Sequence, residues 1–277
     1  MAAPIGAVVD RLDRALAGVD RGGLGLEIGP GGNPLCAGRP ELNVRTLDHM
    51  DQAGLKAKYT AEGWDVSRVP KIDYVWNGEA FKDLVGDTKF KWIVASHVIE
   101  HVPDIVKFIN DCADILAEDG VLSLFVPDKR YNFDYYRALT SLGRLIDANA
   151  HGDIRPSAGA VAEHYLNACM LGPQIAWNKT AIGQPFLVHP LAEAQEKFQL
   201  TRGDTVYRDV HIWTFTPSSF RLIVDDLATL GLTELHESYF SPEGDAEFFV
   251  QLSKRGAGPG LDRVTLLTLT QREQRTV

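Results

Sequence analysis

Cysteine is scarce in this sequence, which has three among 277 residues and no C-x-x-C pair. Such a set predicts neither a disulfide framework nor a thiolate zinc site, and it fits a reducing cytoplasm. Long apolar runs are also missing, because no stretch approaches the roughly 20 residues that span a membrane. The first residues have no basic start before an apolar core, so we expect no secretion signal. The expectation is a cytoplasmic protein.

Lysine and arginine are fewer than the acids, 28 against 37, and the formal net charge is −9. The basic residues form no strong cluster. Long-range attraction to nucleic acid or to an anionic membrane surface is therefore disfavoured. We expect neither nucleic acid nor a membrane as partner.

Short stretches with strand patterns, some apolar and some alternating, recur along the chain. The predicted strands are residues 24–29, 43–48, 71–76, 90–95, 121–126, 233–239 and 247–252. Strands that alternate with helices predict a parallel sheet, whereas the last two, joined by a short loop, predict an antiparallel pair. The expected fold is α/β, a Rossmann-like seven-stranded, mostly parallel sheet with a C-terminal antiparallel hairpin strand.

Helices are predicted where apolar residues recur at helical spacing. Residues 5–17 and about 103–117 show this pattern. A later helix is expected after Thr216, a good N-cap, with Pro217 at its first position.

Composition also divides the chain into regions. Residues 127–213 hold helical patterns, aromatics, histidines and prolines, which predict a mainly helical cap insertion. The core is then formed by residues 1–126 and 214–253. The tail, 254–277, is Gly-rich and then polar, and it is expected either to fray or to add a strand at 264–269.

A glycine-rich segment, EIGPGGNP at 27–34, follows the first predicted strand. Glycines let the backbone approach a ligand closely and expose amide N–H groups at a helix N-terminus. Asn33 is suited to cap that helix and Pro34 to start it. Asp48 ends the second predicted strand, 19 residues after Gly29, where an acid typically holds a ribose diol.

Two cofactors share this layout. A nicotinamide dinucleotide is expected with G-x-G-x-x-G, but Pro34 replaces the third glycine. A pyrophosphate also gains nothing from Glu27, at the entrance of the loop. S-adenosylmethionine has no phosphate and carries a sulfonium and an ammonium, which suit an acid at that place. The residues therefore favour S-adenosylmethionine.

The sequence resembles the class I S-adenosylmethionine-dependent methyltransferases, especially the subgroup that methylates small molecules and glycans. The resemblance covers about residues 24–126, and 214–253 by topology. Its motifs are EIGPGG, LDHMD, DYVWNGEAF, KWIVASHVIEHVPD and GVLSLFVPD. Asn33 stands where many members have a third glycine, and asparagine tolerates the left-handed region.

The resemblance implies cofactor contacts along the ends of the first four strands. Those residues are Glu27, Gly29, Gly31 and Gly32 for the methionine end and its loop, Asp48 and His49 for the ribose, Asp73 and Tyr74 for the adenine, and Ser96 and His97 under the sulfonium.

His97, Glu100 and His101 match H-x-x-E-H, the spacing of inverted zinc peptidases. A zinc peptidase needs both histidines on one helix. Pro103 prefers the first turn of a helix, so the helix is expected to start near it and His97 to remain at a strand end. We therefore predict no metal site, and we expect Glu100 and His101 to brace the loop.

The expected reaction is in-line attack of an acceptor on the sulfonium methyl, which depends mainly on alignment. A hydroxyl acceptor is helped by a general base, and a neutral histidine suits that role. His211, just before the late helix, resembles the position that returns to the acceptor in related methyltransferases, and His97 is the second candidate. Substrate contacts are expected in or beside the insertion, from Tyr131, Tyr135, His164 and Trp213.

The acceptor is expected to be a small molecule or a sugar. The fourth strand ends in Ala95-Ser96-His97 instead of the N/D-P-P-Y/F of amino-methylating DNA enzymes. Two alternatives remain at this point, a nicotinamide-dependent oxidoreductase and a non-catalytic protein that binds S-adenosylmethionine.

Overall fold

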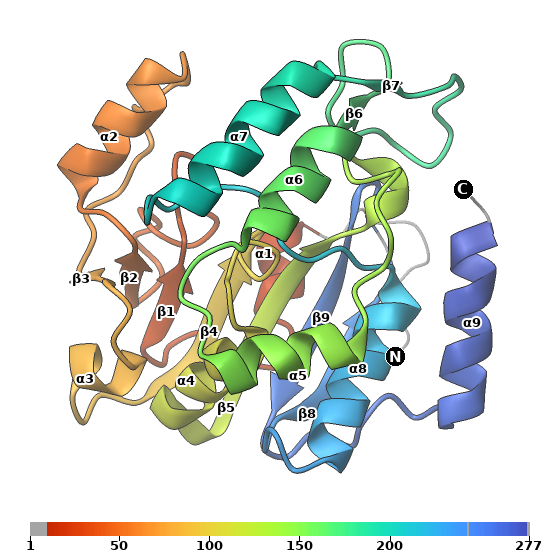
Figure 1. The fold of residues 1–277 in the computed structure, drawn as a ribbon. Helices are drawn as coiled ribbons and strands as arrows, with labels where there is room; N and C mark the ends of the chain where they lie inside the picture. The colour runs from red at the N-terminus through yellow and green to blue at the C-terminus, as the bar shows by residue number, and fades with distance from the viewer. Residues whose placement is uncertain (1–9, 243, 276–277) are drawn as a thin grey trace. The chain divides into compact units, whose positions relative to one another are not determined.

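The structure, a computed structural model, describes residues 10–242 and 244–275 (Figure 1). Seven strands form one mostly parallel sheet in the order β3-β2-β1-β4-β5-β9-β8, which confirms the predicted Rossmann-like α/β fold. The chain divides into two units. One contains the residues up to Ser96 with Ile115–Ser123, and the other contains His97–Asp114 and the chain from Leu124 onward.

The first unit contains parallel strands and short helices. Its elements are α1 (Arg11–Ala15), β1 (Gly25–Ile28), β2 (Val44–Asp48), α2 (Gln52–Ala61), β3 (Tyr74–Val75), α3 (Phe81–Val85), β4 (Phe90–Ser96) and the first part of β5 (Leu116–Pro127). β1 pairs in parallel with both β2 and β4, and all four of its residues are buried. Full burial is expected of a parallel strand covered on both faces. The residues 5–9 of the first predicted helix lie outside the described residues.

Gly25 leaves space in the sheet for a buried side chain of the neighbouring strand. It pairs with Trp92 on β4, and a Cβ at Gly25 would lie 2.1 Å from Cζ2 of the Trp92 ring. A glycine within a strand often marks such a close approach. Its missing side chain lets the indole, which is fully buried, lie over the neighbouring strand.

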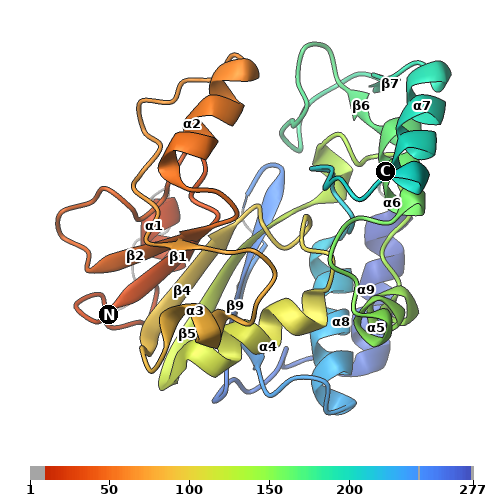
Figure 2. The same cartoon turned by 60° about the vertical axis from the view of Figure 1, so that its left-hand side comes forward.

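The second unit contains the remaining elements. They are α4 (Ile105–Ile115), the end of β5, the short 3₁₀ helix η1 (Lys129–Tyr131), α5 (Leu142–His151), α6 (Ala158–Asn167), β6 (Cys169–Met170), β7 (Phe186–Leu187), α7 (Leu191–Gly203), α8 (Pro217–Thr229), β8 (His236–Ser241), β9 (Glu247–Ser253) and α9 (Arg263–Arg275). β8 and β9 are antiparallel, as predicted. α6 and α7 lie side by side, and so do α8 and α9 (Figures 1 and 2). The small β6-β7 pair was not predicted.

Two helix starts follow the sequence closely. α8 begins at Pro217, and the hydroxyl of Ser219 accepts a hydrogen bond from the Thr216 N–H. α4 begins at Ile105, and the Asp104 carboxylate accepts the Lys107 N–H. The segment from His97 to His101 is therefore not helical, as Pro103 predicts. None of the helices within 10–242 and 244–275 is long and apolar enough to cross a membrane.

Two predictions about secondary structure were wrong. No helix starts at Pro34, and the next helix along the chain is α2. The Asn33 side chain accepts a hydrogen bond from Arg68 instead of capping a helix. Residues 264–269 belong to helix α9, whose first turn is capped by Asp262 through the Thr265 N–H.

Candidate active site

Glu27, at the end of β1, organises the chain that follows the glycine loop. Its Oε1 accepts the N–H of Leu35 at 2.6 Å, and its Oε2 accepts those of Cys36 at 3.0 Å and Ala37 at 2.6 Å. The side chain is buried, and this burial raises the pKa of Glu27 while the three N–H groups act in the opposite direction. These three bonds hold residues 35–37 in a turn, which explains why the predicted helix is absent. They also give Glu27 a structural role in addition to the predicted contact with the methionine end.

The glycines of the loop allow a close approach. Gly29 and Gly31 have φ values of 65° and 49°, in the left-handed region that favours glycine. A Cβ at Gly31 would lie 2.8 Å from the Tyr59 hydroxyl, whereas at Gly32 the nearest atom would be 3.7 Å away. Gly31 is thus the position where a side chain is excluded by both conformation and space.

Gly31→Ala is expected to weaken the binding of S-adenosylmethionine at least about tenfold, since alanine must displace Tyr59 and reshape the loop. Isothermal titration calorimetry measures the effect. Gly63→Ala is the matched control, because Gly63 also has a positive φ of 79° but nothing within 4 Å of its Cβ position. Equal affinities in the two variants would contradict a ligand-binding role for the loop.

Asp48 ends β2, and His49 follows it beside the same loop. Asp48 Oδ1 accepts the His49 N–H at 2.7 Å and lies 2.6 Å from His49 Nδ1. Its Oδ2 accepts one long bond, 3.4 Å, from the Gly31 N–H. A carboxylate oxygen has two lone pairs, so Oδ2 retains capacity for a hydroxyl donor. This geometry fits the predicted ribose contact.

Asp73 is engaged in the sheet. Its Oδ2 accepts bonds from the N–H and the hydroxyl of Thr46, and its Oδ1 lies 3.1 Å from Lys71 Nζ. Tyr74 follows in β3 and is partly buried. The predicted adenine contact of Asp73 competes with these bonds. Residues 76–78 lie just beyond the carboxyl end of β3, at the edge where ligands of such sheets bind, and no role is predicted for them from the sequence.

Ser96 and His97 stand at the end of β4. The Ser96 hydroxyl accepts a hydrogen bond from Arg11 at 2.9 Å. His97 has a φ of 54°, and no other non-glycine residue of the described chain has a positive φ. Such strain often accompanies functional sites.

The His97 imidazole lies between two carboxylates. Its Nε2 is 2.7 Å from Glu247 Oε2, and its Nδ1 is 3.5 Å from Glu100 Oε1. Burial lowers the pKa of His97, but Glu100 and Glu247 outweigh burial and raise it to about 9. His97 therefore carries a second proton at neutral pH, which makes it a poor general base.

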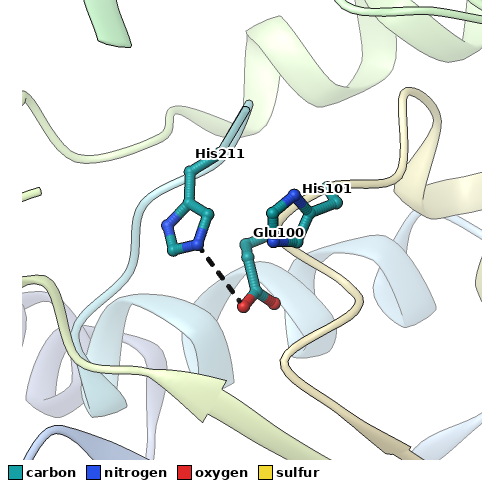
Figure 3. A group of neighbouring side chains, drawn as sticks. All are labelled: Glu100, His101 and His211. Carbon is teal, nitrogen blue, oxygen red and sulfur yellow. Dashed lines mark ion pairs between the residues drawn. The ribbon is translucent and has the colours of Figure 1, made fainter. Parts of the chain in front are cut away.

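His211 is buried and held by a carboxylate. Its Nδ1 lies 2.5 Å from Asp134 Oδ2, and the other oxygen of Asp134 accepts a 2.7 Å bond from Arg137. Burial would raise the pKa of Asp134, but His211 and Arg137 outweigh it and hold that pKa below its usual range. In the tautomer that donates Nδ1–H to Asp134, a neutral His211 carries its lone pair on Nε2. That nitrogen lies 3.7 Å from Glu100 Oε1 (Figure 3).

Glu100 joins the loop after β4 to the segment that carries His211. Its main-chain oxygen accepts the N–H groups of Ile212 and Trp213 at 2.7 and 3.2 Å, bonds that do not depend on the side chain at this position. Its neighbour His101 has Nδ1 2.8 Å from Asp209 Oδ1. Burial lowers the pKa of His101, and the nearby carboxylates outweigh burial and raise it.

The two tyrosines expected to contact substrate are partly buried. The Arg130 guanidinium lies over the Tyr131 ring at 5.2 Å. The Tyr135 ring is 6.0 Å from that of Trp177, and burial raises the pKa of Tyr135. Both remain predictions for substrate binding.

Trp213 and His164, the other two expected substrate contacts, differ in burial and in the hydrogen bonding of their ring nitrogens. Trp213 is buried, and its Nε1–H donates to the Val102 carbonyl at 2.6 Å, so its polar atom already has a partner. His164 is partly buried, and its Nδ1 has no hydrogen-bond partner. Burial lowers the pKa of His164 to about 3, so its ring is neutral at physiological pH.

His164 is expected to make the fold sensitive to acid. Its pKa is about 3 in the fold and about 6.5 in an unfolded chain, so the unfolded chain binds more protons between these values. Stability therefore falls as the pH falls through this window, by at most about 1.4 kcal/mol per pH unit. His164→Gln should flatten this slope in urea unfolding at pH 7, 5.5 and 4.5, whereas the exposed His151→Gln should not. An unchanged slope in His164→Gln would refute the assignment.

Comparison with known proteins shows which family the chain matches. Residues 5–227 match the family described as a methyltransferase domain. The mitochondrial ubiquinone biosynthesis O-methyltransferase of Bos taurus is 33% identical over 105 residues, which cover 36% of this chain and 27% of that protein. The matched part thus spans about a quarter of the curated relative.

Two solved structures share parts of the architecture. One, from Rhodobacter sphaeroides and described as a Zn-dependent alcohol dehydrogenase, has a TM-score of 0.47 and 14% identity, with 88% of this chain and 89% of that chain covered. The complex of DhpI with SAM and HEP has a TM-score of 0.42 and 18% identity, with 87% and 82% covered. At these values neither structure bears on the acceptor. The family match extends over most of the sequence, and the chain belongs to the S-adenosylmethionine-dependent methyltransferases.

Proposed function

We propose that this methyltransferase transfers its methyl group to a hydroxyl of a small molecule or a sugar. The observation that carries the proposal is the Asp134–His211 pair. A hydroxyl is a weak nucleophile that must lose its proton, and Asp134 beside Nδ1 of His211 favours the tautomer whose Nε2 lone pair accepts that proton. An amine acceptor would have less need of such a base.

The proposed step is a single displacement. The hydroxyl oxygen attacks the methyl carbon, the bond between carbon and sulfur breaks, and S-adenosylhomocysteine leaves. The hydroxyl proton passes to Nε2 of His211. Since the sulfonium loses its charge during attack, alignment supplies much of the rate, and the base adds a factor of about 10²–10⁴.

The chain's acidic balance, 28 basic against 37 acidic residues, supports a small acceptor over a nucleic acid. The O-methyltransferase among its relatives supports oxygen as the acceptor atom. We assign donor binding to the core, residues 1–126 and 214–253, and acceptor binding to the insertion 127–213.

Methyl transfer from S-[methyl-³H]adenosylmethionine to a panel of acceptors tests the proposal. The panel pairs phenols, catechols and sugars or nucleotide sugars with the matching amines and thiols. We expect label in one or more hydroxyl compounds and none in their O-methylated forms. Label only in the amines or thiols would overturn the assignment to oxygen.

A further inference from the structure

The Glu100 carboxylate is buried in an unusual state. It is completely inaccessible, and neither of its oxygens has a hydrogen-bond partner. An ionised carboxylate without hydrogen-bond partners is costly to bury. The protonated His97 places one positive charge beside it, with Nδ1 at 3.5 Å, and His211 Nε2 lies at 3.7 Å.

Three side chains here are arranged like metal ligands. One ligand atom each from Glu100, His101 and His211 lies within 4.8 Å of the others. Figure 3 shows the two imidazoles flanking the carboxylate. Two ligands on a tetrahedral zinc, each bonded at about 2.0–2.1 Å, are separated by about 3.3 Å. The 3.7 Å between His211 and Glu100 is close to that value.

The surroundings of both imidazoles resemble those of metal-bound histidines. His211 Nδ1 is 2.5 Å from Asp134, and His101 Nδ1 is 2.8 Å from Asp209. Metal-bound histidines commonly give their second nitrogen to a carboxylate, which fixes the tautomer and makes the ligand nitrogen more basic. In both residues Nε2 is then the nitrogen available to an ion. His101 and Asp209 are partly exposed, so this side of the cluster reaches the surface.

We propose that Glu100, His101 and His211 form a binding site for a divalent first-row transition cation, with Zn²⁺ as the reference ion. Two imidazoles and one carboxylate favour such ions over Mg²⁺ or Ca²⁺, which prefer oxygen ligands. Three protein ligands leave coordination positions open, as in catalytic sites. The sequence argument against zinc considered only a site with His97 and His101 on one helix. His211 comes instead from a segment 110 residues beyond His101 along the chain.

One consequence rests on the proposed function. A cation at this place would bind the acceptor oxygen and lower the pKa of the hydroxyl, and His211 would then act as a ligand instead of as the base. The binding itself does not depend on the acceptor, and it is measured without cofactor or acceptor.

Competition between the whole protein and a chromophoric zinc chelator tests the site. We expect one Zn²⁺ per chain with a dissociation constant of micromolar or below. Glu100→Gln and His211→Gln should each weaken binding at least tenfold. His189→Gln is the matched control, because His189 lies 3.0 Å from Glu193 in a histidine–carboxylate pair outside the cluster, and its affinity should be unchanged.

X-ray absorption of the zinc-loaded native protein keeps the test independent of how the variants fold. Two imidazoles and oxygen ligands in the zinc shell would support the site. Failure to bind one equivalent of Zn²⁺ at millimolar concentration would overturn it. So would a shell with fewer than two imidazoles, or native affinity in a folded Glu100→Gln variant.

Discussion

Glu27→Ala is expected to lower the free energy of unfolding by about 3–5 kcal/mol and to abolish measurable binding of S-adenosylmethionine. The substitution removes the acceptor of three N–H groups, those of Leu35, Cys36 and Ala37. A buried donor left without its acceptor costs about 1–3 kcal/mol. The turn that these bonds hold follows the glycine loop directly, so the loop loses its support together with the turn.

Urea unfolding and calorimetric titration with the cofactor measure the two effects. Glu41→Ala is the matched control, because Glu41 is an exposed acid in the same stretch, 3.9 Å from Arg39, and an exposed pair of this kind contributes little. Glu27→Gln keeps one carbonyl acceptor and should fall between the native protein and Glu27→Ala. Native stability in Glu27→Ala would show that the turn does not depend on this carboxylate.

The fold could be predicted because its signals are local. Each strand of the sheet overlaps one of the short stretches predicted from the sequence. Thr216-Pro217 and Pro103 mark two helix starts that the structure places within two residues. The errors occur where a distant contact overrides a local preference. Asn33-Pro34 reads as a helix start, but the buried carboxylate of Glu27, six residues earlier than Asn33, draws the next N–H groups into a turn.

The candidate site also has a part that the local sequence predicts and a part that only distant contacts create. The glycine loop and Asp48 lie close together in sequence, so spacing alone predicts their proximity. Asp134 and His211 are 77 residues apart, and no periodicity links them. His211 could be nominated from its place before α8, but its partner could not. The partner identified from neighbouring sequence would be Asp209, which instead faces His101.

Asp134→Asn is expected to reduce turnover by about 10²–10⁴-fold while leaving the affinity for S-adenosylmethionine within about twofold. Arg137 is a donor only, and it faces one oxygen of Asp134 at 2.7 Å. It will therefore select the oxygen of the new amide and turn the NH₂ group toward His211 Nδ1. Nδ1 must then accept, and the proton moves to Nε2. With that proton in place, Nε2 can neither take a proton from a hydroxyl nor bind a cation.

The comparison of turnover with cofactor affinity separates this effect from misfolding, which would change both. The ¹⁵N shifts of the His211 ring report the tautomer directly, and Asp147→Asn, at an exposed position of α5, controls for the loss of one charge. Turnover that stays within threefold of the native value, with the tautomer reversed, would remove His211 Nε2 from the reaction. A loss of turnover without a change of tautomer would instead assign the effect to the lost charge beside Arg137.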